Sequence, residues 1–251
     1  MGAKTGLLAF GGGDLRAAMR HAGPADLSAS EALVRRIHPG HAVERTADNT
    51  LLDGTYPPAD VTYAAVTDRV SVVCDQRLML DHPSRLPAHL LALAGGGRMV
   101  LHAMHSVVDF LAFGVWEDGR IVRSLSLSPD SGVLEDIGTP LPFEAPFWAG
   151  SHPVEPVPGW PDQRPYPLPF HPLHLGEEAL RALVGFIIEG QPDESDVDAD
   201  AITMYGFQVT DPSGQEQRSR EAAMARAQAA MGPARRFRMG PDGNLVEVEQ
   251  W

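Results

Sequence analysis

Histidines are the residues with the most evident chemical potential in this sequence. Ten are present, and six of them form His-x-x-His pairs. The three pairs are His38/His41, His102/His105 and His171/His174. A protein metal site needs three or four converging ligands, and such a pair presents both rings on one face only on a helix. None of the pairs lies on a convincing helical pattern, so we assign no metal ligands and expect no bound cofactor.

A second arrangement involves His102 and the strand-forming residues after it. If His105 and Ser106 form a turn between two antiparallel strands, His102 lies opposite Asp109, and Asp109 lies opposite Ser128. This register would align a histidine, a carboxylate and a hydroxyl, although a nucleophilic triad needs the histidine in the middle. Two interpretations stay open: a self-satisfied polar cluster, and a hydrolase-type site that uses His102, His105, Asp109 and Ser128, with or without a metal.

Arg123 is the charged residue that we expect on an apolar face of the central sheet. An unpaired buried guanidinium is very costly, so it should have a carboxylate partner. The candidate partners are Asp109, Glu135 and Glu144. The candidate binding residues are Arg123, Trp148, Trp160, Tyr166 and His171.

Residues 140–172, here called the belt, differ abruptly in composition from the rest of the chain. They hold 11 of the 22 prolines and six aromatic residues. Prolines remove backbone donors and disfavour regular structure, yet so many aromatic side chains would not be left in water. We expect an ordered, irregular belt wrapped over the sheet. A loop that contacts a protein partner is the functional alternative, because long irregular segments are often functional.

Gly11-Gly12-Gly13-Asp14 separates a predicted strand from a short helical pattern, a place where phosphates are often bound. The spacing fits neither the dinucleotide fingerprint nor the P-loop, since Arg16 stands at the third glycine position. Asp14 would also repel a phosphate while capping the helix. A tight turn is the favoured interpretation.

The elements that must position these residues centre on a meander at residues 98–132. Asp118-Gly119 is a strong two-residue hairpin signal, and it would pair Val115 with Val122. One face would then hold Phe110, Ala112, Gly114, Trp116, Ile121, Arg123, Leu125 and Leu127. The other would hold Asp109, Leu111, Phe113, Val115, Val122, Ser124, Ser126 and Ser128. A polar site would belong on this second face.

The remaining patterns predict strands and helices around the meander. Further strands are expected at 4–10, 61–66, 70–74 and 201–209, and helices at 15–20, 28–37, 84–94 and 177–189. We therefore predict an α+β fold: a mostly antiparallel sheet built on a central meander, with helices packed on it and a proline-rich irregular belt.

Asp211-Pro212 marks a predicted domain boundary. Residues 1–210 form the α+β domain, including the belt, and residues 211–251, here called the tail, form a helix and a hairpin. Six arginines make the tail basic on an acidic protein. The tail helix has little apolar area, so it either lies on the body or binds a partner.

The charge balance limits the partners. Acidic residues number 33 and basic residues 20, giving a net charge of −13, whereas nucleic acids and anionic membranes attract clustered positive charge. We expect neither partner. A single cysteine, Cys74, excludes an intrachain disulfide and favours a reducing compartment. With neither a signal-peptide pattern nor an apolar run long enough to span a bilayer, we expect a cytoplasmic protein.

Several segments resemble an uncharacterised bacterial protein family, a domain of unknown function. They read VVCDQRLMLDHPSRLP, LHAMHSVVDF, VWEDGRIVRSLSLSPDSGVLEDIGTPLPFEAPFWAGSHPV and YPLPFHPLHLGEEALRALVGF. The resemblance covers roughly residues 1–210 and implies no activity, cofactor or catalytic residue.

In the absence of a complete catalytic pattern, we predict a non-enzymatic interaction or regulatory protein with a protein partner at the belt or the tail. The alternatives are the hydrolase-type enzyme and a small-molecule binding protein.

Overall fold

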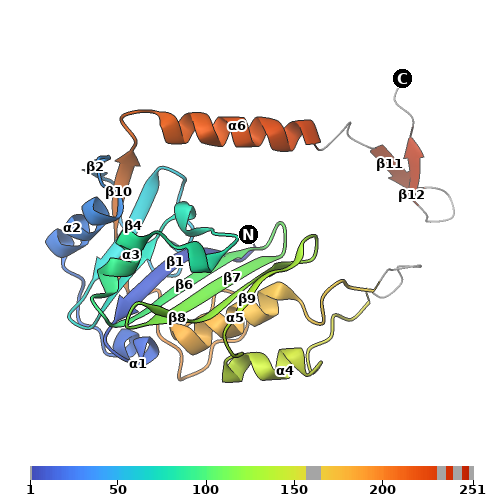
Figure 1. Ribbon diagram of the computed structural model, residues 1–251, viewed down its shortest axis with the longest axis horizontal. Helices are drawn as coiled ribbons and strands as arrows, with labels where there is room; N and C mark the ends of the chain where they lie inside the picture. Colours follow the sequence, from blue (N-terminus) through green and yellow to red (C-terminus); the bar gives the residue numbers. More distant parts are fainter. Residues whose placement is uncertain (1, 157–164, 231–235, 240–244, 249–251) are drawn as a thin grey trace. The chain divides into compact units, whose positions relative to one another are not determined.

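The computed structural model describes residues 2–156, 165–230, 236–239 and 245–248 (Figure 1). Trp160, a candidate binding residue, lies outside the described residues. The chain divides into two units, Met1–Val209 and Thr210–Trp251, and each is described by itself.

The first unit is built on a ten-stranded sheet in the described part of the chain. Its strands are β1 (Lys4–Gly11), β2 (Ala42–Arg45), β3 (Asn49–Thr50), β4 (Val61–Val66), β5 (Val70–Cys74), β6 (Arg98–His105), β7 (Phe110–Glu117), β8 (Arg120–Ser128), β9 (Gly132–Ile137) and β10 (Thr203–Thr210). Their order is β2-β10-β4-β5-β1-β6-β7-β8-β9, with β3 also on β10, and neighbours from β10 to β9 run antiparallel. The predicted α+β fold is confirmed.

Helices cover both faces of this sheet. On one face lie α1 (Leu15–Arg20) and α5 (Pro172–Leu183), and on the other α2 (Leu27–Ile37) and α3 (Ala88–Leu91) (Figure 1). Successive strand residues point to opposite faces, so Leu7 of β1 joins the first core and Leu8 joins the second. Nearly every strand residue of β1, β6 and β7 is buried, because these strands lie in the middle of a sheet covered on both sides.

The helices begin and end where local chemistry dictates, which moves several predicted boundaries. Asp14 caps α1 as predicted, but Asp26 rather than Ser28 caps α2, accepting a 2.8 Å hydrogen bond from Ala29 N. The helix predicted at 84–94 is interrupted. Its central α3 is flanked by short 3-10 helices, since Pro87 cannot donate within a helix.

Helix α5 begins five residues before its predicted start and ends six before its predicted end. Pro172 occupies its first position, and the ring of His171 accepts a hydrogen bond from Leu173 N at 3.3 Å. It ends before Gly185, whose φ of +106° is unfavourable for other residues. The apolar Ile187 and Ile188 therefore lie beyond the helix and not on its stripe.

The predicted register of the meander holds only near the turn. Asp118 and Gly119 have φ of 50° and 73°, as a type I′ turn requires. A β-bulge then places Arg123, not Val122, opposite Val115. Every later residue of β8 is shifted to the other face. Arg123, Leu125 and Leu127 thus share a face with Leu111, Phe113 and Val115, while Ser124 and Ser126 lie beside Gly114 and Ala112, so both predicted faces are wrong beyond the bulge.

The turn between β6 and β7 is also longer than predicted. His105 pairs with Phe110, which leaves residues 106–109 as a four-residue turn. His102 consequently lies opposite Phe113, and Asp109 sits in the turn with a φ of 46°. The predicted pairing of His102 with Asp109 is wrong.

The belt contains a 3-10 helix at Pro142–Glu144 and the short helix α4 (Ala145–Trp148). Its described aromatic side chains pack against the core beneath α5 rather than facing solvent; they are Phe143, Phe147, Trp148, Tyr166 and Phe170. Among the described residues, no helix combines the length and apolar character that crossing a bilayer would require.

The second unit consists of α6 (Gln215–Ala230) and an antiparallel hairpin of β11 (Arg236–Met239) and β12 (Leu245–Val248). The polar and alanine-rich sequence of α6 gives it no apolar stripe. The six arginines of the tail are matched by six acidic residues, so the tail carries no net formal charge. It is basic only in comparison with the body.

Candidate functional site

The sheet opens at the seam between β10 and β4, and a cavity lies there. Tyr205 pairs with Ala64, but Thr203 and Met204 pair with β3 instead. Val66 on β4 pairs with Ser71 of β5 on one side and is left without a partner strand on the side of β10. Its N–H donates to Ser30 Oγ at 3.0 Å, and its carbonyl accepts from Asp26 N at 2.8 Å. The first turns of α2 and its N-cap residue thus border the gap.

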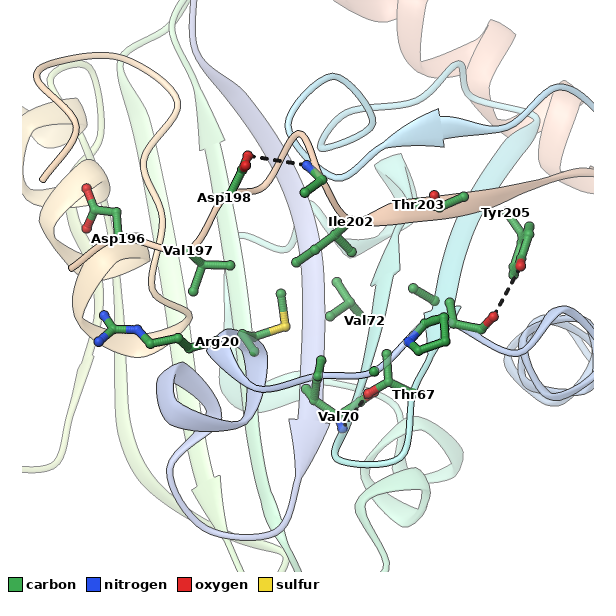
Figure 2. Close-up of a pocket in the computed structure, with 17 residues that line it drawn as sticks. Arg20, Thr67, Val70, Val72, Asp196, Val197, Asp198, Ile202, Thr203 and Tyr205 are labelled. Carbon is green, nitrogen blue, oxygen red and sulfur yellow. Dashed lines mark hydrogen bonds between the residues drawn. The ribbon is translucent and has the colours of Figure 1, made fainter. Parts of the chain in front are cut away.

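This seam pocket has a volume of about 400 Å³ and is lined by three segments, at 19–25, 65–72 and 196–205 (Figure 2). Its floor is apolar and comprises Met19, Ala65, Val70, Val72, Val197 and Ile202. The volume is at the small end of the range for ligand pockets, roughly 300–1,000 Å³. The cavity suits a small molecule with an apolar body.

Hydrogen bonds within the protein hold the walls of the pocket. The hydroxyl of Tyr205 donates to Ala25 O at 3.1 Å, which ties β10 to the loop after α1. Thr67 Oγ1 donates to Val70 O at 2.9 Å within the β4–β5 turn. Figure 2 shows the Tyr205 bond and a further bond from Val70 N to Thr67 Oγ1, and together these bonds fix the shape of the cavity before any ligand enters.

Charged residues gather at one end of the pocket. Figure 2 shows Arg20 and Asp196 at this end, and Thr67, Thr203 and Tyr205 at the other. Asp196 is already paired, with Arg181 Nε at 3.1 Å. Burial alone would raise the pKa of Asp196, but hydrogen bonds from Asp193 N and the Arg181 guanidinium hold it below its usual value.

His102, the centre of the predicted hydrolase site, is fully buried between the sheet and α5. Its Nε2–H donates to Gly176 O at 2.9 Å, so its Nδ1 accepts from the Thr5 hydroxyl at 2.8 Å. Burial lowers the pKa of His102 to about 4, although the Gly176 carbonyl acts in the opposite direction. Both ring nitrogens are therefore committed, and the neutral ring links β1, β6 and α5.

The other predicted catalytic residues lie apart from His102. His105 packs its ring edge against Tyr56, with centroids 5.6 Å apart, and its Nδ1 accepts from Val107 N. Ser128 Oγ accepts from Ser131 N at 3.2 Å in the turn after β8. The His105 and Ser128 side chains therefore each stabilise the turn beside them and do not meet in a common site.

Three predicted site residues do meet, in a combination that we did not anticipate. Asp109 Oδ2 lies 3.5 Å from His171 Nε2, and the ring of Tyr166 stacks on His171. Burial, reinforced by the negative charges of Asp109 and Asp130, raises the pKa of Tyr166 to about 12. Since His171 Nδ1 accepts from Leu173 N, this imidazole is held neutral as the cap of α5, and burial lowers its pKa.

Arg123 is fully buried and paired with Glu144, as one of the expected partners. The two side chains make parallel hydrogen bonds of 2.8 and 2.7 Å. Asp136, which was not among the candidates, also pairs with Arg123. Glu144 accepts further from Leu141 N and Trp148 Nε1, so the pair fastens the belt to the sheet.

A buried network around Asp75 escaped prediction. Its carboxylate is 3.1 Å from His38 Nε2 and 3.2 Å from Arg77 Nη1, and it accepts from the Thr62 hydroxyl. Burial alone would raise the pKa of Asp75, but His38, Arg77 and Thr62 together hold it below its usual value. The one usable signal was a charged residue directly after an apolar strand. In the described part of the chain, no group of three or more His, Cys, Asp or Glu could hold a metal ion.

Comparison with known protein families assigns most of the first unit to one family. A family model matches residues 5–207. The chain belongs to the family of unknown function DUF6928. The predicted resemblance to a domain of unknown function is thereby confirmed, and the match stops short of the tail. No curated protein and no solved structure matches the chain. Membership of DUF6928 therefore brings no activity with it.

Proposed function

We propose that this DUF6928 protein is a cytoplasmic, non-enzymatic regulatory or interaction protein that binds a small molecule in the seam pocket. One observation carries the proposal: a cavity of about 400 Å³ with an apolar floor lies where β10 leaves β4, and its walls are held by hydrogen bonds of their own. An apolar pocket with a few polar groups at its rim is the usual form of a ligand site.

The position of the pocket suits a regulatory role. Its lining includes Thr203 and Tyr205 of β10, and the same strand ends at Thr210, where the tail unit begins. A ligand that restrains residues 196–205 therefore acts on the strand from which the tail departs. Cys74 is buried, and burial raises the pKa of its thiol, which keeps it an inert packing group suited to a reducing compartment.

The hydrolase-type alternative has less support. A nucleophilic mechanism needs a base with a free ring nitrogen beside a hydroxyl or thiol. Both nitrogens of His102 are engaged, and His171 uses Nδ1 to cap α5 and Nε2 toward Asp109. A base in either position would have to give up a bond that holds the fold.

A protein partner at the belt or tail stays a prediction. The described belt aromatics pack against the core, which leaves the tail as the better contact surface. Pull-downs with the full chain should recover a stoichiometric partner, and substitution of Arg218 and Arg238 by glutamine should weaken its recovery if the tail makes the contact. Recovery of no partner would contradict this prediction and leave the small-molecule proposal standing.

A thermal-shift screen tests the pocket. Small apolar and amphipathic compounds should raise the melting temperature, because a ligand at 100 times its Kd stabilises the native state by about 2.7 kcal/mol. Ala65→Leu, which fills the floor, should abolish the shift. Val133→Leu on the exposed side of β9 is the matched control and should leave it unchanged. A shift that survives Ala65→Leu would place the ligand elsewhere.

A further inference from the structure

We propose that Val197 limits the length of the ligand that the seam pocket accepts, and that this ligand is an uncharged molecule with a short apolar chain; this inference rests on the function proposed above. The basis is a second cavity, of about 300 Å³, beside the seam pocket. Among the described residues, Asp196, Val197 and Asp198 line both cavities. These three residues form the wall that the two cavities share.

Val197 is the buried part of the shared wall. Its side chain is 8% exposed and packs in the first core, whereas Asp196 is half-buried and Asp198 is exposed. Figure 2 shows Val197 between Asp196 and Ile202 along the edge of the seam pocket. The two methyl groups of Val197 therefore close the shared wall on its inner side.

Contacts with the turn after α5 hold Val197 in place. Its backbone N–H donates to Gly185 O at 2.7 Å, and a Cβ at Gly185 would lie only 2.8 Å from Val197 Cγ2. The branch at Cβ also restricts the side chain to few rotamers. Two residues earlier, Ser195 Oγ accepts from Arg16 Nη2 at 2.8 Å. A ligand therefore cannot displace Val197 without breaking bonds that hold this segment.

The second cavity also offers apolar surface. Carboxylates of the 193–200 segment lie around it, and the rest of its lining is largely apolar: Leu52, Phe186, Ile187, Pro192 and Ala199. A chain that passed from the seam pocket into this cavity would bury further apolar area, which is favourable. The size of the residue at position 197 therefore decides whether a longer chain is accepted.

The polar groups around the seam pocket favour an uncharged ligand. Figure 2 shows the Arg20 guanidinium and the Asp198 carboxylate at separate edges, directed away from the apolar floor. Asp196 is paired with Arg181, and the hydroxyl of Tyr205 is used by Ala25. A charged group that entered the cavity would lose its water without gaining a partner, which is costly.

The first experiment measures chain length on the unaltered full-length protein. Calorimetry with the primary alcohols from 1-butanol to 1-octanol should show affinity rising about fourfold per methylene. The rise should stop at the length at which the chain reaches Val197. Hexanoate and hexylamine should bind more weakly than 1-hexanol by roughly tenfold or more. An affinity that rises without a limit, or that is equal for the charged compounds, would overturn the inference.

Variants then assign the limit to Val197. Val197→Ala should lengthen the accepted chain by about two carbons, because two methyl groups are removed. Adding Ala199→Val, which narrows the second cavity, should reverse this gain. Val197→Ile should shorten the accepted chain, and it tests the same role if the alanine variant does not fold.

Val43→Ala is the matched control. Val43 is 7% exposed, packs in the second core and lines neither cavity. Its replacement should lower the melting temperature to a similar extent as Val197→Ala and leave the accepted chain length unchanged. A longer chain accepted by both variants would mean that general loosening, and not Val197, sets the limit.

The outcomes separate this inference from the proposed function. If the alcohols bind, Ala65→Leu abolishes their binding and the Val197 variants change no limit, the seam pocket is a ligand site and the role of Val197 is overturned. If no alcohol binds but the wider screen finds a compound that Ala65→Leu excludes, the inference fails and the proposed function stands. If the screen also finds none, both fail.

Discussion

The central meander and the seam pocket differ in how their polar groups are used. In the meander, His102 and Arg123 are fully buried, and each is met by partners from elsewhere in the fold. In the pocket, polar side chains hold the walls, and an apolar floor is left open between them. The meander looked more like a site in the sequence because it concentrates reactive residue types. Open apolar space is the better guide to binding, since satisfied groups already have their role in the fold.

The largest expected effect on stability comes from breaking the buried ion pair between Arg123 and Glu144. Arg123→Met leaves the carboxylate of Glu144 buried without its cation, and the free energy of unfolding should fall by about 3–5 kcal/mol. Chemical denaturation measures the loss. The double variant Arg123→Met/Glu144→Leu should lose less than the sum of the single variants, because no unpaired charge remains between the two positions.

An exposed ion pair provides the control for this cycle. Arg35 and Glu31 lie 2.7 Å apart on α2 in solvent, and Glu31→Ala, which leaves the bond from Arg35 to Val43 O in place, should cost only about 0.3–0.5 kcal/mol. If Arg123→Met is as mild as Glu31→Ala, the Arg123–Glu144 pair does not anchor the belt, and the structural interpretation of the meander fails.

The next effect concerns the acid sensitivity of His102. Its pKa falls from about 6.5 in the unfolded chain to about 4 in the fold, so between these values the unfolded state binds the extra proton. Stability is unaffected by this group above pH 6.5 and declines as the pH drops toward 4, by about 3 kcal/mol in all. His102→Gln keeps a donor and an acceptor and should flatten this part of the stability profile. An unchanged slope in the variant would show that His102 is not the titrating group, and the ligand-induced rise in melting temperature at pH 7 should be unaffected.

A smaller effect tests how closely α5 approaches the sheet at His102. A Cβ at Gly176 would lie 2.6 Å from Met104 Sδ and 3.2 Å from Leu111 Cδ1. Gly176→Ala should therefore destabilise the protein by about 1–3 kcal/mol, even though alanine favours helices. Gly12→Ala, where the added Cβ meets nothing within 4 Å, is the control and should be nearly neutral. Equal stability of the two variants would mean that α5 can shift without cost.

The sequence could predict what local chemistry determines. Three features follow from the residues themselves. The Asp118-Gly119 pair favours positive φ, Asp14 can cap a helix, and a buried Arg123 requires a carboxylate partner. The bulge in β8 could not be predicted, because it depends on packing across several strands and has no signature of its own. One extra residue there was enough to exchange the faces of Arg123 and Ser124.

The candidate site was beyond prediction for a related reason. The seam pocket exists because β10 lies beside β4, more than a hundred residues earlier in the chain, and pairs with it only from Tyr205 onward. Periodicity identifies a strand but not its neighbour. The contact between Asp109 and His171 likewise joins a turn to the start of α5, and each residue was singled out without any indication that they would meet.

The smallest expected effect on stability comes from a substitution in the wall of the seam pocket, Tyr205→Phe. It distinguishes a loss of stability from a loss of ligand binding. Tyr205→Phe removes the hydrogen bond to Ala25 O but keeps the ring, over which the Arg45 guanidinium lies at 5.4 Å. The free energy of unfolding should fall by only about 0.5–1.5 kcal/mol, since water can reach the partly exposed carbonyl of Ala25. The binding of a compound found in the thermal-shift screen should nevertheless weaken, because the loop after α1 is then less firmly held. Calorimetry and denaturation of the same variant measure both quantities, and a loss of stability without a loss of affinity would mean that this wall of the pocket is as purely structural as the meander.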